Sequence, residues 1–308
     1  FSSFESVSSF SMRLSRLIAW LLLVSILDWV DGQDQNSFND ATSKQVFTLG
    51  FYSTSGTPQV CVPKTSPGWQ VLSVVTAQGE KIFGQAMAVV SVSESLKMVN
   101  VHFRGAESMT TFVFSGYTYL LQSDFPVQLF EGISVASEFA KTFTALWQGG
   151  LRTAMNSAWD EYCDFPILIS GDSVGGCPAQ MLAVKMKLLG MWDKPKISVY
   201  AYKSPRCGYQ QFAMAVEASS SITYQIRHNE IVFNYPPTAC TALNPASPQN
   251  CFWHAGYGLQ YNKGLFGTTG PVRCANAELA ACKAGSILNI LNHNGFHGMS
   301  YGIIPPTC

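Results

Sequence analysis

The stretch Gly171–Gly175 reads GDSVG and places a serine between two glycines, directly after an apolar run. This spacing fits the G-x-S-x-G pattern, in which the serine occupies a strained turn from a strand into a helix. Ser173 is therefore a candidate nucleophile for acyl transfer. The backbone N–H of Val174 and the N-terminus of the following helix would supply positive potential for an oxyanion. The alternative is an ordinary turn that happens to contain a serine.

A serine nucleophile needs a base, and the base needs an acid that orients it. In enzymes with this kind of turn, the acid and the histidine follow the serine in the chain. Glu230 lies just after a predicted strand and before a proline pair, and it is the candidate acid, with a surface glutamate as the alternative. His297, near the C-terminal end, lies where the base is expected, and His293 is the runner-up.

The residues around Ser173 provide the strand and the helix that the turn requires. Phe165–Ser170 is a short apolar run of the buried parallel-strand type. A helix is predicted over Val174–Gly190, with the last glycine as its C-terminal stop. Further along we expect strand Lys196–Tyr202, helix Gln210–Ser220 and strand Ile222–Asn229. This alternation predicts an α/β fold with a mostly parallel central sheet and helices on both faces.

The remaining segments give a less regular pattern. Thr110–Phe125 is rich in aromatic residues and is ambiguous between strand and helix. No repeat or long linker divides the chain, so residues 33–308 are expected to form a single domain. The other predicted elements are strands Gln70–Gly79, Lys81–Ser93 and Leu96–Gly105, two helices within 131–162 that divide near Gly149–Gly150, and helix Glu278–Leu291.

The N-terminal region has the pattern of a secretory signal peptide. Met12 opens a short basic segment, and the apolar run Leu17–Leu27 follows it. We expect residues 1–32 to comprise an N-terminal extension and a signal peptide, Met12–Gly32. The alternative is a membrane anchor, but the apolar run is interrupted by Asp28 and is shorter than the ~20 residues that a span needs.

All nine cysteines follow this region, and secretion favours disulfides among them. Because the number is odd, at least one cysteine stays unpaired within a monomer. Cys177 is the candidate free thiol, because it follows the glycines on a buried helix face. Cys240 and Cys251 would close a short proline-rich loop. The rest of the connectivity is left open.

The charge balance and the motif inventory exclude other classes of function. Nineteen basic residues balance nineteen acidic ones, so the chain lacks the basic excess of a nucleic-acid-binding domain. The sequence contains neither an HExxH motif nor a cysteine pair with zinc-finger spacing. We expect no metal and no cofactor.

Five segments, in order, resemble the class 3 lipases, the fungal-lipase-type branch of the α/β-hydrolases. They read VHFRGAES, ILISGDSVGG, VYAYKSPRCG, RHNEIVFNYPP and FHGMSYG. The resemblance covers the chain from about Gln70 to its C-terminal end. It implies that Ser173 is the nucleophile, Glu230 the acid and His297 the base. It also makes the backbone N–H groups of Ala106 and Val174 the oxyanion donors.

The same resemblance implies a substrate and a compartment. The chain would be a secreted carboxylic ester hydrolase of lipid metabolism that acts on acylglycerols at an interface, with transient contact to a membrane or lipid-droplet surface. A mobile apolar lid would follow the first oxyanion residue, and Glu107–Phe125 has the aromatic content for it. An ordinary core strand is the alternative for that segment.

Four departures from the family pattern favour a rival hypothesis. Asp172 stands where histidine is usual, and a carboxylate there opposes the oxyanion unless it points away and is paired. Ala106 lacks the hydroxyl of the usual Thr or Ser, a type of donor whose loss costs roughly 3 kcal/mol. Glu230 replaces aspartate, and the gap from His297 to Tyr301 is one residue longer than usual. The rival is a weakened or inactive secreted lipid-binding protein on the same fold. A third hypothesis is an esterase for short soluble esters.

Overall fold

The computed structural model describes residues 40–54, 57–106, 126–130, 132–228, 251–261, 271–275 and 277. Two compact units are distinguished, Phe1–Ser43 and Lys44–Cys308, and the central sheet lies in the second. The expected signal region, Thr110–Phe125 and the expected helix Glu278–Leu291 lie outside the described residues. None of the helices in the described ranges combines the length and the apolar character that a membrane span requires.

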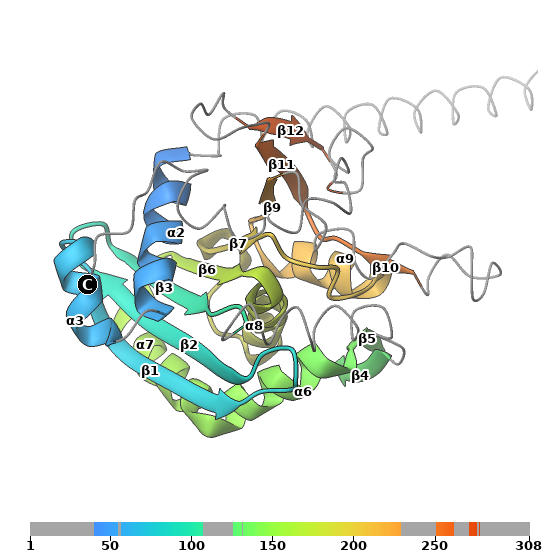
Figure 1. The fold of residues 1–308 in the computed structure, drawn as a ribbon, viewed down its shortest axis with the longest axis horizontal. Helices are drawn as coiled ribbons and strands as arrows, with labels where there is room; N and C mark the ends of the chain where they lie inside the picture. Colours follow the sequence, from blue (N-terminus) through green and yellow to red (C-terminus); the bar gives the residue numbers. More distant parts are fainter. Residues whose placement is uncertain are drawn as a thin grey trace, which may run out of the picture. The chain divides into compact units, whose positions relative to one another are not determined.

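An eight-stranded sheet forms the centre of this unit, in the order β1-β2-β3-β6-β7-β9-β11-β12 (Figure 1). The strands from β3 to β11 run parallel to one another, whereas β1, β2 and β12 pair antiparallel with their neighbours. The sheet is therefore mostly parallel, as the sequence predicted. Its strands are β1 (Gln70–Gln78), β2 (Gln85–Ser93), β3 (Met98–Phe103), β6 (Ile167–Asp172), β7 (Ile197–Tyr202), β9 (Ile222–His228), β11 (Tyr257–Tyr261) and β12 (Val272–Cys274).

Helices cover both faces of the sheet, which confirms the predicted α/β-hydrolase architecture. On one face, alternate residues of β3 and β6, such as Val101 and Ile169, are fully buried and share a core with the apolar side chains of α8. On the other face, the ring of Phe47 in α2 packs edge-on against Tyr202, with 5.1 Å between ring centroids. The helices are α2 (Asp40–Thr54), α3 (Pro58–Thr65), α6 (Ser137–Leu146), α7 (Arg152–Tyr162), α8 (Gly176–Leu189) and α9 (Gln210–Ser219).

The alternation predicted downstream of residue 165 is confirmed element by element. β6, α8, β7, α9 and β9 follow one another in the expected order. Gly190 ends α8 with a φ of 67°, in the left-handed region where glycine has no Cβ to clash. The sequence had assigned the same role to this glycine.

The second predicted strand begins later than expected. Residues 81–84 form a turn before β2, and the N–H of Gly84 donates to the carbonyl oxygen of Glu80 at 3.2 Å. Ile82 and Phe83 gave this turn its strand-like apolar character, yet both are buried beneath the sheet. The Phe83 ring packs edge-on against Phe139, with 6.1 Å between centroids. The apolar run at Ile82 and Phe83 therefore belongs to a turn that is packed into the core, and not to a strand.

The helical region predicted over 131–162 starts with a strand instead. β5 (Ile133–Ala136) pairs antiparallel with β4 (Pro126–Phe130), and both belong to a small sheet of order β10-β8-β5-β4. The other two strands of this sheet are β8 (Gly208–Tyr209) and β10 (Phe252–Trp253). The expected division of the two helices is confirmed, because a π-helical turn over Trp147–Leu151 separates α6 from α7 and Gly150 there has a φ of 129°.

Candidate active site

Ser173 lies at the carboxyl end of β6, on the turn that leads into α8. Its φ is 53°, in the left-handed region that residues other than glycine rarely adopt. A short 3-10 turn, Ser173–Gly175, connects it to the first residue of the helix. Such a conformation costs about 1–3 kcal/mol and persists only where the surroundings impose it. This is the backbone that the G-x-S-x-G pattern predicts for a nucleophile.

The two glycines of the pattern are required by close backbone contacts. A Cβ at Gly171 would lie 2.2 Å from the carbonyl oxygen of Gly175. A Cβ at Gly175 would lie 2.5 Å from the carbonyl oxygens of both Phe103 and Arg104. A side chain at Gly171 would push the end of β6 away from the start of α8, and one at Gly175 would push the turn away from the end of β3. The glycines thus set the distance between the serine and the neighbouring strand.

The segment that follows β3 lies directly against the turn. Phe103 and Gly171 are register partners in the parallel pair β3/β6, so the segments that follow these two strands leave the sheet at the same edge. A Cβ at Gly105 would lie 3.1 Å from the Cβ of Ser173. Val174, fully buried, follows Ser173 on the other side. The structure therefore brings Ser173 together with Val174 and with the segment that leads to Ala106, the two residues expected to donate to an oxyanion.

The expected acid and base lie outside the described residues. This applies to Glu230, His297 and the alternative base His293. β9 ends at His228, two residues before Glu230, and is separated from β6 in the sheet by β7 alone. The assignments of these residues remain predictions from the sequence.

The comparison with known proteins agrees with this geometry. Residues 100–239, which include the serine turn, match the family model Lipase (class 3). Over these residues the chain is similar to the class 3 lipases.

Two relatives and one solved structure show the extent of the similarity. Lipase ZK262.3 of Caenorhabditis elegans is 22% identical over 244 residues, which cover 77% of this chain and 67% of the relative. The lipase of Rhizomucor miehei is 24% identical over 280 residues, covering 85% of this chain and 71% of that lipase. A solved triacylglycerol lipase, whose catalytic centre is described as a serine protease triad, superposes with a TM-score of 0.65 at 18% identity, covering 81% of this chain and 91% of the other. At that identity the likeness establishes a common fold.

The departure at Asp172 from the class 3 lipase pattern is matched by a cation. The Lys203 Nζ lies 2.9 Å from the Asp172 Oδ1, and the lysine side chain is 0% exposed while the aspartate side chain is 14% exposed. The backbone N–H of Lys203 donates to the Ile226 carbonyl oxygen at 2.7 Å, and the Phe47 ring lies 5.9 Å from its Nζ. Sequence reasoning missed this lysine. The signal was available, because Asp172 and Tyr202 are register partners and Lys203 comes next.

His102 lies on the same face of the sheet as Asp172 and is a structural residue. Its Nδ1 is 3.0 Å from the Ser170 hydroxyl, which in turn donates to the Asn100 side-chain oxygen at 3.3 Å. Burial lowers the pKa of His102 to about 4, and the charge of Asp172 raises it in partial opposition. The imidazole is therefore neutral at neutral pH.

The expectation that Cys177 carries a free thiol is wrong. Cys177 forms a disulfide with Cys207, and their Cα atoms are 5.2 Å apart. The start of α8 lies against the segment after β7, because a Cβ at Gly176 would lie 2.5 Å from the Cβ of Ser204. Among the described residues the free cysteine is Cys163. Cys251 is also disulfide-bonded, as expected, and its predicted partner Cys240 lies outside the described part.

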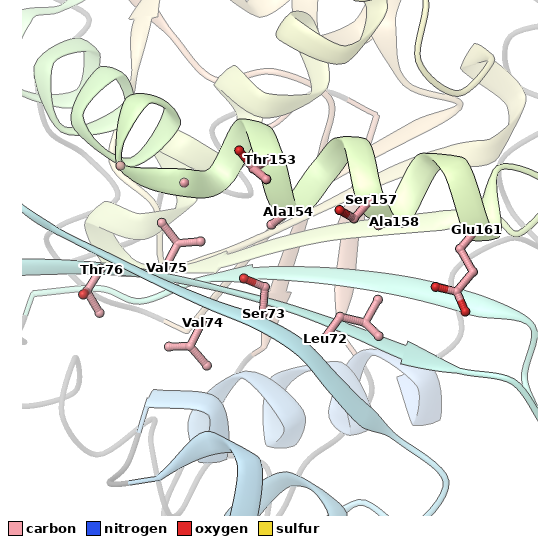
Figure 2. A pocket seen from close by; sticks show the side chains of 12 residues that line it. Leu72, Ser73, Val74, Val75, Thr76, Thr153, Ala154, Ser157, Ala158 and Glu161 are labelled. Atoms are coloured by element: carbon pink, nitrogen blue, oxygen red, sulfur yellow. The ribbon is translucent and has the colours of Figure 1, made fainter.

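A cavity of about 690 Å³ lies along β1, the edge strand of the sheet (Figure 2). Its lining comes from β1, from Gly149 and Gly150 of the π-helical turn, and from α7, where Glu161 points toward the strands. β2 and β3 separate β1 from β6. This cavity is therefore separate from the turn that carries Ser173. In the part of the chain that the structure describes, no cluster of His, Cys, Asp and Glu could hold a metal ion.

Proposed function

We propose that this protein is a secreted lipase of the class 3 type that hydrolyses acylglycerols or related lipids at an interface. The left-handed φ of Ser173, between a parallel strand and a buried helix, is the observation that carries the proposal. A binding protein has no need for a serine held in this conformation, whereas a nucleophile is held by it at the carboxyl edge of the sheet, where the substrate of such enzymes binds. The inactive lipid-binding alternative is not favoured.

The proposed reaction proceeds through an acyl-enzyme. Ser173 Oγ attacks the ester carbonyl carbon while His297 takes the hydroxyl proton, and Glu230 orients the imidazole and stabilises its positive charge. The backbone N–H groups of Ala106 and Val174 hold the negative oxygen of the tetrahedral intermediate. The alcohol leaves with the proton from the imidazole. Water then attacks the acyl-enzyme by the same route and releases the fatty acid.

The match of residues 100–239 to the class 3 lipase model supports an ester of a lipid as the substrate. The solved relative is a triacylglycerol lipase, which supports acylglycerols as the first substrates to test. The signal-like segment Met12–Gly32 and the Cys177–Cys207 disulfide support secretion, because disulfides persist in oxidising compartments. Contact with a membrane or lipid-droplet surface would follow from the use of an interfacial substrate.

The test uses the chain from Gln33 onward, secreted with its disulfides intact. Wild type, Ser173→Ala and Ser157→Ala are compared for hydrolysis of short- and long-chain acyl esters and for labelling by a fluorophosphonate. Ser157, an exposed serine of α7 that lines the distant cavity, is the matched control. We expect Ser173→Ala to lose both signals and Ser157→Ala to keep both.

The outcome also selects among the hypotheses. Higher rates on long-chain emulsified esters than on short soluble ones support the lipase, and the reverse supports the esterase. A folded wild-type chain that neither turns over nor labels would contradict the enzyme and support the lipid-binding alternative. Replacing His297 and, separately, His293 by alanine then identifies the base, since only one of the two changes should abolish labelling.

A further inference from the structure

The Asp172–Lys203 ion pair lies next to the proposed nucleophile and has no part in the reaction described above. Asp172 directly precedes Ser173, and its Oδ1 contacts the lysine ammonium at 2.9 Å. Its other oxygen, Oδ2, lies 3.4 Å from the position that a Cβ would take at Gly105. The carboxylate is therefore wedged between Lys203 and the segment leading to Ala106. A negative charge at this place adjoins the region where the oxyanion forms.

The charged and titratable groups around this carboxylate come from several elements. Lys203 faces it from the end of β7, and His102 faces it from β3, neutral because burial lowers its pKa to about 4. Tyr202 is its register partner on β7. Arg104, which follows β3, directs its guanidinium to the backbone carbonyl oxygen of Gln85. From α2 comes the Phe47 ring, an uncharged cover over the lysine.

A buried charge needs a partner, because the interior solvates it poorly. The Lys203 side chain is wholly buried and that of Asp172 is 14% exposed, so each charge has the other as its close counter-charge. Together they are neutral. Without the lysine, the carboxylate would disfavour the oxyanion and would favour the protonated, inactive form of a nearby histidine base.

We propose that Lys203 is a positioning residue of the reaction, which holds the Asp172 carboxylate in an ion pair so that its charge does not act on the oxyanion at Ser173. The inference rests on the proposed function of Ser173 as nucleophile. It explains how this chain carries a carboxylate where the class 3 lipases that it resembles usually have histidine. Lys203 acts through Asp172 and does not touch the substrate.

The experiment compares wild type with Lys203→Met, Lys203→Arg and the double variant Asp172→Asn/Lys203→Met. The readouts are the second-order rate constant of fluorophosphonate labelling and kcat/KM between pH 5 and 9. We expect Lys203→Met to lower both by roughly 10- to 100-fold at neutral pH and to move the acidic limb of the profile upward by about one pH unit. Lys203→Arg should keep the limb in place, because the charge remains. The double variant should restore the limb and bring the rates to within about threefold of wild type.

Several outcomes would overturn the inference while leaving the proposed function intact. One is a Lys203→Met variant that labels like wild type. Another is an equal loss at every pH that Asp172→Asn does not relieve, since that would indicate a structural role alone. If Lys203→Met does not fold, the double variant decides, because it removes both charges. The double variant must show the far-UV circular dichroism of a folded protein and must be labelled by the fluorophosphonate; otherwise the inference fails. Wild type that does not label contradicts the proposed function itself, and this inference with it.

Discussion

Replacing Gly175 by alanine should damage the reaction far more than the fold. The new Cβ would lie 2.5 Å from the carbonyl oxygens of Phe103 and Arg104 and 2.7 Å from the carbonyl carbon of Arg104. These are backbone atoms at the end of β3, and its parallel pairing with β6 prevents them from rotating away. To reach an ordinary separation of about 3.5 Å, the turn and the strand must move apart by roughly 1 Å.

The size of the effect follows from what lies on each side of this contact. The turn carries Ser173 and Val174, and the strand continues into the segment that ends at Ala106. A displacement of about 1 Å separates the two proposed oxyanion donors, and misplacement on this scale can cost ~100-fold in rate. Overpacking of this kind costs about 1–3 kcal/mol of stability, which a domain with 5–15 kcal/mol can lose and still fold. We therefore expect a folded protein whose labelling by fluorophosphonate is slower by about 100-fold.

Gly190→Ala is the matched control. Gly190 also has a left-handed φ, 67°, but a Cβ there would meet nothing within 4 Å. It should cost about 1 kcal/mol through backbone conformation alone and leave the labelling rate unchanged. Urea unfolding gives the stabilities, and the labelling rate is measured at a temperature where both variants are folded. If Gly175→Ala labels within threefold of wild type, the close approach of the two segments does not set the geometry of the site.

Three further predictions concern the buried residues and the disulfide around the site. The free energy of unfolding should fall by about 3 kcal/mol as the pH drops from 6.5 toward 4, because His102 takes up a proton in the unfolded chain, whereas the buried ring, with its pKa lowered to about 4, does not. Urea unfolding measured across this pH range should show the decrease for wild type and lack it for His102→Gln. Gly50→Ala should lower the free energy of unfolding by about 2 kcal/mol, because its Cβ would lie 2.2–2.7 Å from the His102 ring; an unchanged Tm would contradict this packing. Cys177→Ala/Cys207→Ala should cost about 3 kcal/mol by removing a cross-link across 30 residues, whereas Cys163→Ala, which removes a free thiol, should leave the urea midpoint unchanged.

The part of the fold around Ser173 could be predicted because its signals are local. The strand before the serine is a continuous apolar run, and the helix after it ends at a glycine. Gly171 and Gly175 mark positions where two stretches of backbone touch, a demand that only glycine meets. Each of these features is indicated by residues that are neighbours in the chain.

Other elements could not be predicted, because their burial is decided elsewhere in the fold. Ile82 and Phe83 read as strand, yet they belong to a turn packed into the core. β5 read as the start of a helix, but its pairing with β4 turns it into a strand. Cys177 read as a buried free thiol, whereas the loop after β7 brings Cys207 beside it. Each error comes from a partner that is distant in sequence.

The ion pair of Asp172 was not predicted, although the signal for it was present in the sequence. The residue alone indicated a weakened site, because a carboxylate next to a nucleophile opposes the oxyanion. In a parallel sheet, however, the residues at the ends of neighbouring strands lie side by side, and Asp172 is in register with Tyr202. The residue after Tyr202 is Lys203, so the compensating cation could have been found by aligning the ends of the two strands. An unusual residue before the nucleophile is therefore best judged together with the residues that end the next strand, since the pair, rather than the single residue, sets the charge at the site.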